Sequence, residues 1–297
     1  MALADLLTTA AIRADPGQKP RDDELDLFGL THPGKVRREN QDHFLLCTVH
    51  PQVVIHGTSL PEPDRLPLRG ERLATIGLVA DGVGGGTGGR EASQLAVETI
   101  TRYVSSTLRC YHAAGSAAEE EFLEALRAAV LEAHAAVRAE AAGRAAAKGM
   151  ATTLTLAIAV WPRVYVVQVG DSRCYYYWDG VLQQVTRDQT LAQDLVDRGA
   201  LPPERAGESP FSHVLASAIG GREATPEVTR LDLRRGCVVL LCSDGLTKHV
   251  LDAEIAERLR VMESSEQVCR TLLDLALERG GSDNITVLVG RARGKSS

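Results

Sequence analysis

The sequence lacks the long apolar runs and the basic surplus that mark membrane proteins and nucleic-acid binders. No apolar run approaches the roughly 20 residues that a membrane-spanning helix requires. The formal net charge is -6 and the isoelectric point is near 5.8, whereas a nucleic-acid binder should present a basic face. The first residues contain no basic segment ahead of an apolar stretch, so we expect no signal peptide. We therefore expect neither nucleic acid nor a membrane as a partner.

Paired cysteines are also missing. The six cysteines form no C-x-x-C pair, and most of them stand in apolar stretches, where cysteine is usually a small buried hydrophobic residue. This usage predicts a reduced, cytoplasmic protein. The sequence also has no Cys-x5-Arg stretch, which excludes phosphatases that use a cysteine nucleophile.

The spacing of apolar residues predicts two long helices in a chain that is otherwise rich in strands. Residues 91–108 and 119–144 carry apolar side chains at helical spacing, and Ser116 with Glu119 is expected to form a capping box. The other predicted elements are strands at 25–30, 43–49, 73–80, 152–160, 164–169, 173–178, 237–242 and 285–289, and shorter helices at 191–197 and 264–279. Because the strands come in runs and the helices are grouped, the pattern indicates sheets covered by helices and not a doubly wound parallel fold.

Two segments are predicted to lie outside these elements. Residues 1–24 are expected to form a loosely attached arm. Residues 50–72 contain four prolines and two glycines, a composition typical of an inserted loop that is longer than most connections. This loop either shapes a surface for a partner or is an inert excursion.

Four aspartates stand at the mouths of apolar β segments. Asp81 ends the run IGLVAD, and Asp244 ends VVLLCSD. Asp171 follows VVQVG, and Asp283 stands just before ITVLV. Carboxylates that converge on one rim of a sheet repel one another unless cations compensate, and carboxylate and carbonyl oxygens suit Mg²⁺ and Mn²⁺. The favoured interpretation is a metal site to which Gly82 adds its backbone carbonyl, although a lone Asp-Gly pair is better explained as a tight turn.

The stretch GKVRRENQD at 34–42 adds an arginine and a further aspartate. An enzyme that handles phosphate benefits from a planar guanidinium, which can bind two phosphate oxygens through parallel hydrogen bonds. Arg37 is the candidate for that role, and Asp42 follows five residues later. By itself the stretch is better explained as a solvated charged loop.

Taken together, these segments resemble the metal-dependent Ser/Thr protein phosphatases of the protein phosphatase 2C (PP2C, PPM) family, in their compact bacterial form. The similarity covers about residues 25–292. The matching segments are GKVRRENQD (34–42), ADGVGG (80–85), GMATTLTLA (149–157), VGDSR (169–173), LLCSDGLTKHV (240–250) and GGSDNITVLV (280–289). Each motif is weak alone, but six in the right order and spacing are highly specific.

The resemblance implies an α+β fold, a four-layer α-β-β-α sandwich with two central antiparallel β-sheets flanked by helices. It implies one phosphatase domain at 25–292, with residues 50–72 as an inserted loop, about 188–220 as a flap and 293–297 as a tail.

The resemblance also implies two Mn²⁺ or Mg²⁺ ions bridged by Asp81. Asp244 and Asp283 would bind one ion, and the Gly82 carbonyl would bind the other. Asp171 would join Asp244 at a third, weaker metal site.

In this scheme Arg37 binds the phosphate, Asp42 holds metal-bound waters, and a water bridging two ions attacks phosphorus. The leaving-group acid stays open, because Val83 stands where some relatives have histidine. A metal-bound water and His32 are the candidates.

The implied function is the hydrolysis of phosphoserine and phosphothreonine in proteins, with a phosphorylated Ser/Thr kinase or its target as partner. The alternative is a catalytically silent binding or sensor module. A degenerate domain should have lost at least one site residue, and all are present: Arg37, Asp81, Gly82, Asp171, Asp244 and Asp283. A nucleotide-binding glycine loop at 84–89 is disfavoured, because no G-K-[ST] motif accompanies it.

Overall fold

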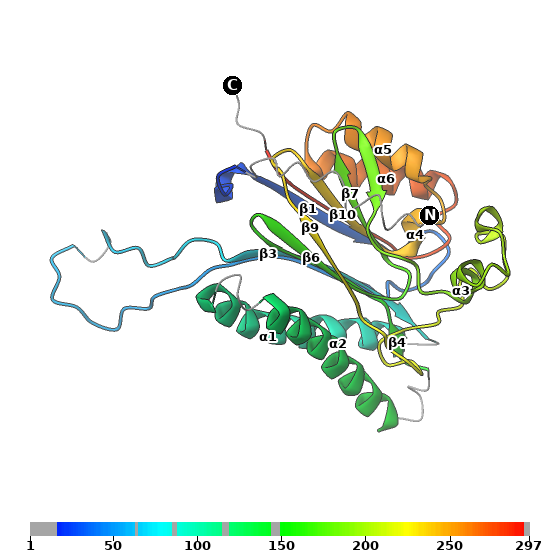
Figure 1. Cartoon of the computed structure of the whole chain (residues 1–297), viewed down its shortest axis with the longest axis horizontal. Coiled ribbons are helices and arrows are strands. Elements are labelled where there is room, and N and C mark those ends of the chain that lie inside the picture. The colour runs from blue at the N-terminus through cyan, green and yellow to red at the C-terminus, as the bar shows by residue number, and fades with distance from the viewer. Residues whose placement is uncertain (1–16, 63–64, 85–87, 115–118, 144–148, 294–297) are drawn as a thin grey trace.

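Two antiparallel sheets lie face to face between layers of helices (Figure 1). The computed structural model describes residues 17–62, 65–84, 88–114, 119–143 and 149–293. One sheet has the strand order β1 (Leu25–His32), β11 (Ile285–Ala292), β10 (Val238–Cys242), β7 (Arg173–Trp178) and β8 (Val181–Gln184). The other has the order β2 (Asp42–Val49), β3 (Ala74–Val83), β5 (Leu154–Val160), β6 (Arg163–Val169) and β9 (Glu227–Asp232), with β4 (Ala151–Thr152) paired to β3.

The helices form the two outer layers. The first layer is α1 (Gly88–Ala114) with α2 (Glu119–Ala142), which packs on the sheet that contains β3 and β5 (Figure 1). The second is α5 (Asp252–Arg260) with α6 (Ser265–Glu278), which packs on the sheet that contains β1 and β11. The predicted α+β, four-layer sandwich is confirmed, and no described helix is long and apolar enough to cross a bilayer.

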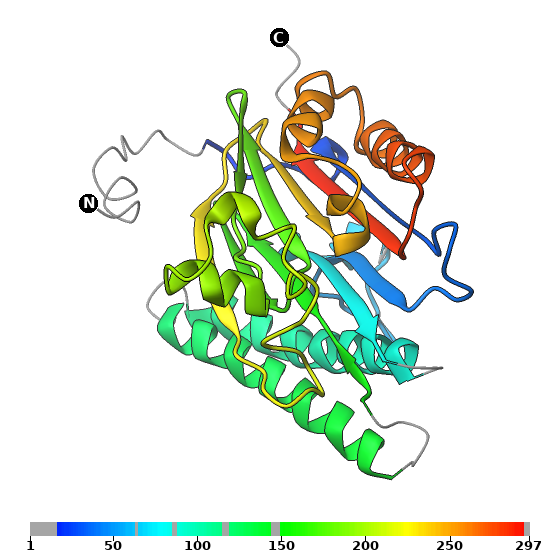
Figure 2. The ribbon, with the colours of Figure 1, turned by 90° about the vertical axis from the view of Figure 1, so that its right-hand side faces the viewer.

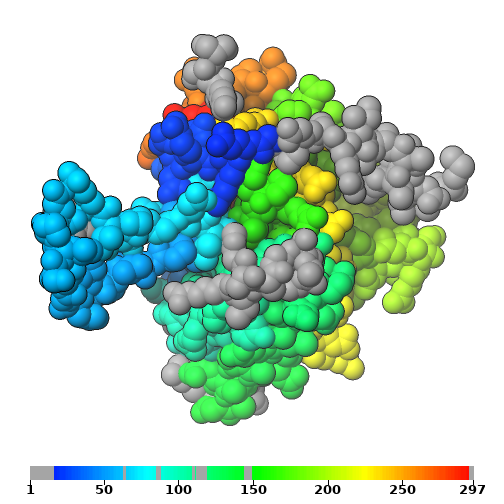
Figure 3. All heavy atoms as spheres, turned by 60° about the vertical axis from the view of Figure 1, so that its left-hand side comes forward, coloured from blue at the N-terminus to red at the C-terminus, as the bar shows by residue number. Residues whose placement is uncertain are grey.

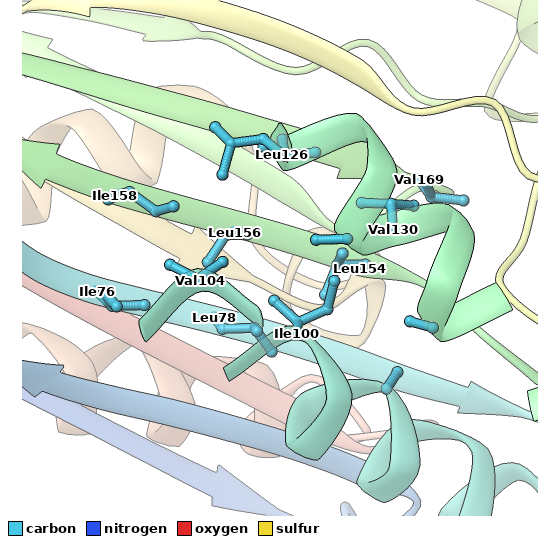
Figure 4. Close-up of a cluster of buried hydrophobic side chains, with 14 of the residues drawn as sticks. Ile76, Leu78, Ile100, Val104, Leu126, Val130, Leu154, Leu156, Ile158 and Val169 are labelled. Carbon is cyan, nitrogen blue, oxygen red and sulfur yellow. The ribbon is translucent and has the colours of Figure 1, made fainter. Parts of the chain in front are cut away.

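Three separate apolar layers hold the sandwich together. The layer between α1, α2 and their sheet includes Ile100, Leu126 and Leu156, all buried (Figure 4). The middle layer, between the two sheets, includes Val79 and Leu241. Because the inner strands β3, β5, β6 and β10 are covered on both faces, they are apolar almost throughout, and this is why they were predictable from the sequence.

Sequence patterns miss the elements that bury few side chains. Strand β9 has no fully buried residue, and α5 buries only Ile255 and Leu259 among many charged residues. By contrast, the predicted cap of α6 is present, since the Ser264 hydroxyl accepts a hydrogen bond from the backbone N–H of Gln267. The predicted capping box at Ser116 lies outside the described residues.

The predicted 50–72 loop runs outward and back between β2 and β3 as an extended arm (Figures 1 and 3). Its two limbs are joined near the base, where the backbone N–H of Val53 donates to Leu68 O at 2.8 Å. The arm leaves the end of β2 and returns at the start of β3, so it lies at the opposite end of the sandwich from Asp81. Of the expected N-terminal arm only 17–24 is described, and Arg72 and Arg235 bind this part by hydrogen bonds.

Candidate metal centre

Helices α3 (Leu191–Asp197) and α4 (Asp244–Thr247) lie at one end of the sandwich (Figures 1 and 2). A pocket lined in part by Asp244 of α4 opens at this end. Strands β3 and β6 both pair antiparallel with β5, so their C-terminal ends meet at the same edge. The end of β10 and the start of β11 are neighbours in the facing sheet. The pocket is lined by six of the predicted residues: Arg37, Asp81, Gly82, Asp171, Asp244 and Asp283.

Asp42 lies behind the pocket wall and does not line it. It is the register partner of Asp81 across β2 and β3, and only 3% of its surface is exposed. Its Oδ2 atom accepts hydrogen bonds from Ser243 Oγ at 2.8 Å and Thr286 Oγ1 at 2.6 Å, whereas its buried Oδ1 atom has no partner among the described residues. Burial raises the pKa of Asp42 to about 6, although these two hydrogen bonds oppose the rise.

The backbone of Asp81 is fixed by two threonines from the segment GMATT. The Asp81 N–H donates to Thr153 Oγ1 at 3.0 Å, and the Thr152 hydroxyl donates to the Asp81 carbonyl at 2.9 Å. The Thr153 hydroxyl also bonds the hydroxyl of Ser172, the residue after Asp171, at 2.7 Å. The ends of β3 and β6 are therefore held together by one threonine.

Gly82 must be glycine because of its close neighbours. A Cβ atom there would lie 2.2 Å from the carbonyl oxygen of Gly89 and 2.7 Å from that of Gln41. A side chain at position 82 would therefore prevent the start of α1 and the loop before β2 from packing against the end of β3.

Burial and mutual repulsion raise the pKa of Asp81 well above its usual range. After burial, the causes are the neighbouring carboxylates, of which Asp42 acts most strongly and Asp244 next. The pKa of Asp171 rises to about 8 for the same reasons, burial first and then Asp244, while Lys248 acts in the opposite direction.

Asp283 is stabilised differently, because two cations bind it. Arg37 donates from Nε to Oδ1 at 2.7 Å and from Nη2 to Oδ2 at 2.9 Å. The Lys248 ammonium lies 2.7 Å from Asp283 Oδ2 and 2.6 Å from Asp244 Oδ2. Burial acts to raise the pKa of Asp283, but the hydrogen bonds from Arg37 and Lys248 outweigh it and the pKa is lowered.

Asn284 ties the Arg37 loop to the start of β11. Its side chain accepts a hydrogen bond from the Gln41 N–H at 2.8 Å and donates to the carbonyls of Pro33 at 3.0 Å and Glu39 at 2.9 Å. The loop that carries Arg37 is therefore bound at three points to the residue next to Asp283.

The donor set fits hard divalent cations. Carboxylate oxygens and a close backbone carbonyl are the ligands that Mg²⁺ and Mn²⁺ take, and their charge would offset the repulsion that raises the pKa of Asp81. The Oδ1 atoms of Asp42 and Asp244 are buried without a hydrogen-bond partner among the described residues, as an unsatisfied metal ligand would be. Within the described ranges, however, no three acidic, histidine or cysteine side chains are arranged to enclose one ion. Arg37 binds Asp283, and Lys248 binds both Asp283 and Asp244.

Two histidines differ in their access to the pocket. His32, predicted as a candidate acid, is not among the described lining residues, and its Nδ1 atom accepts a hydrogen bond from the Gly34 N–H at 2.9 Å. His213, in the predicted flap, lines the pocket and is exposed.

Four residues of the centre carried no role in the sequence analysis: Lys248, Ser243, Thr286 and Asn284. Three of them are uncharged residues next to a predicted ligand or inside a strand, where the usual role is structural. Lys248 stands inside a matching motif, four residues after Asp244, and that spacing on a helix is the available signal.

The model of the family described as protein phosphatase 2C matches residues 58–279 of the chain. The chain belongs to the protein phosphatase 2C family. Similar members include the serine/threonine phosphatase stp of Listeria monocytogenes, 31% identical over 261 residues that make up 87% of this chain and 92% of that protein.

The family also includes a longer relative with a solved structure. The serine/threonine protein phosphatase PstP of Mycobacterium tuberculosis is 38% identical over 220 residues, which are 74% of this chain and 40% of that protein. The crystal structure of PstP matches with a TM-score of 0.72 at 30% identity, over 91% of this chain and 99% of that chain. A PstP catalytic domain in complex with two manganese ions matches with a TM-score of 0.68.

Proposed function

We propose that the chain is a metal-dependent phosphatase that hydrolyses phosphoserine and phosphothreonine in proteins. The observation that carries the proposal is the convergence of Asp81, Asp171, Asp244 and Asp283 on one pocket together with Arg37. Membership of the protein phosphatase 2C family and the two manganese ions bound by a relative support the same conclusion.

The acidic residues would hold two Mn²⁺ or Mg²⁺ ions. Asp81 would bridge the ions, Asp244 and Asp283 would bind one, and the Gly82 carbonyl would bind the other. Asp42 would orient waters from behind Asp81 through its free Oδ1 atom. When bound, the ions supply a water of lowered pKa as nucleophile and neutralise charge on the phosphoryl oxygens.

The side chains of the protein position the phosphate. Arg37 is 56% exposed, and the guanidinium donors that Asp283 does not engage, those of Nη1 above all, would bind the phosphate. Its bonds to Asp283 hold it beside the metal ligands, and the tether through Asn284 limits how far it can move. We propose His213, which is exposed in the same pocket, as the proton donor to the departing alkoxide.

The substrate class and the compartment are part of the same proposal. We infer that the substrates are proteins phosphorylated by Ser/Thr kinases, since the relatives are named serine/threonine phosphatases. The five described cysteines are unpaired, which favours the reducing cytoplasm as the place of action.

Hydrolysis of a phosphothreonine peptide and of p-nitrophenyl phosphate tests the proposal. We expect turnover with Mn²⁺, loss of turnover after EDTA, and recovery when Mn²⁺ is returned. A folded chain that turns over neither substrate with Mn²⁺ or Mg²⁺ would favour the silent binding module.

A further inference from the structure

Lys248 is a side-chain cation placed between two predicted metal ligands. It follows the single turn of α4, whose first residue is Asp244, so helical spacing returns the lysine to that carboxylate. Its ammonium group lies 2.6 Å from Asp244 Oδ2 and 2.7 Å from Asp283 Oδ2. About a fifth of the side chain is exposed, so solvent screens these contacts only in part.

The lysine completes the hydrogen bonding of Asp283. A carboxylate offers about four lone-pair positions. The four donors bound to Asp283 are Arg37 Nε, Arg37 Nη2, Lys248 Nζ and the backbone N–H of Asn284. A divalent ion can therefore bind this carboxylate only after at least one donor leaves.

Of the two charged donors, Lys248 is the one whose departure opens both ligands at once. Arg37 contacts Asp283 alone, whereas Lys248 contacts Asp283 and Asp244 together. An ammonium is a compact point charge with rotatable donors on a flexible stem, so it can leave one carboxylate and remain near another. Asp171 lines the same pocket as Lys248 and offers such a place.

We propose that Lys248 is a resident cation of the pocket, and that a divalent ion enters between Asp244 and Asp283 by displacing its ammonium group. This proposal rests on the metal site of the proposed function. It predicts two unequal ions, since the ion on the Asp81 and Gly82 side meets no such competitor. It also predicts that the displaced lysine, held beside Asp171, opposes the third ion that the family resemblance implies at Asp171 and Asp244.

Calorimetric titration with Mn²⁺ of the full chain, freed of metal with EDTA and dialysed, tests the exchange. Lys248→Met removes the charge and keeps most of the length, and Lys248→Gln is a second neutral variant in case the first folds poorly. We expect either variant to bind the weaker ion about tenfold more tightly and to unfold at a lower temperature in EDTA. Lys248→Arg keeps the charge and should therefore show no gain in Mn²⁺ affinity, and Lys35→Met, at an exposed lysine, is the matched control.

The outcomes separate the two proposals. If the unchanged chain takes up Mn²⁺ and hydrolyses phosphopeptide, but neutral variants with native circular dichroism bind Mn²⁺ no more tightly, the exchange is wrong and the phosphatase stands. Weaker binding in the neutral variants would also overturn the exchange, because it would make Lys248 a support for the ion. If the unchanged chain neither binds Mn²⁺ nor turns over substrate, both proposals fail.

Discussion

Asp81 and Asp283 face the same pocket, yet their carboxyl groups are stabilised by opposite means. Asp283 is bound by Arg37 and Lys248, and its pKa is lowered. Asp81, with Asp42 and Asp171 around it, forms no ion pair among the described residues, and its pKa is raised. One half of the acidic cluster is thus stabilised by side-chain cations, whereas in the other half burial and mutual repulsion raise the pKa values of the carboxyl groups. A divalent ion would therefore compete with lysine and arginine at Asp283 and would relieve the repulsion around Asp81.

The largest effect is expected from Asp81→Asn, which removes the carboxylate common to both ions. Turnover of p-nitrophenyl phosphate with Mn²⁺ should fall by about 1,000-fold or more, which corresponds to about 4 kcal/mol of transition-state stabilisation. In EDTA the same variant should unfold at a temperature equal to or above that of the unchanged chain, because the change removes a repelled, half-buried carboxylate. Steady-state kinetics and calorimetric melting measure the two effects, and full activity in this variant would refute the ligand assignment.

Asp283→Asn is the matched substitution at the carboxylate that Arg37 and Lys248 bind. It should also abolish turnover, but in EDTA it should destabilise the fold by about 1–2 kcal/mol, since it leaves two cations with one partner fewer. Opposite shifts of the melting temperature in Asp81→Asn and Asp283→Asn would establish the contrast between the halves. Shifts in the same direction would remove it.

The carboxyl groups with raised pKa values predict an effect of intermediate size, which is a dependence of folding stability on pH. The folded-state pKa of Asp42 is raised to about 6 and that of Asp171 to about 8, above the ordinary value of 3.8. Between the ordinary and the raised pKa the folded chain binds more protons than the unfolded chain, so its stability falls as the pH rises.

Melting curves in EDTA should therefore move to lower temperature between pH 5 and pH 8. With saturating Mn²⁺ the trend should reverse, because the ion replaces the protons and binds more tightly as they leave. A melting temperature in EDTA that does not depend on pH across this window would contradict the raised pKa values.

The smallest effect on stability is expected from Arg37→Ala. More than half of the Arg37 side chain is exposed, so its loss should cost no more than about 1 kcal/mol of folding free energy. The KM for a phosphopeptide should rise about tenfold while Mn²⁺ binding persists, because in the proposed function the guanidinium would contact the phosphate and not the ions. An unchanged KM would place the phosphate clamp elsewhere.

The sequence predicted the site residues that stand at the ends of buried strands. Each aspartate that ends an apolar strand was predictable, because a charge there breaks an otherwise buried run, and the antiparallel pairing then brings Asp81 and Asp171 to one edge. Lys248 was not predictable as a partner of Asp283, because the two are joined only by the packing of α4 against β11. The roles of Ser243, at the junction of β10 and α4, and of Thr286, inside β11, were hidden because a buried hydroxyl leaves no pattern in the sequence.

Gly245 shows how closely α4 packs against the start of β11. A Cβ atom at this position would lie 1.9 Å from the carbonyl oxygen of Asn284, so α4 rests on the backbone at the start of β11 without room for a methyl group. Gly245→Ala would therefore push apart two segments that carry Asp244 and Asp283, with no change to any charged group. The spacing of the two carboxylates therefore depends on the absence of a side chain at Gly245. A redesign of this loop for higher thermal stability would have to keep glycine at this position.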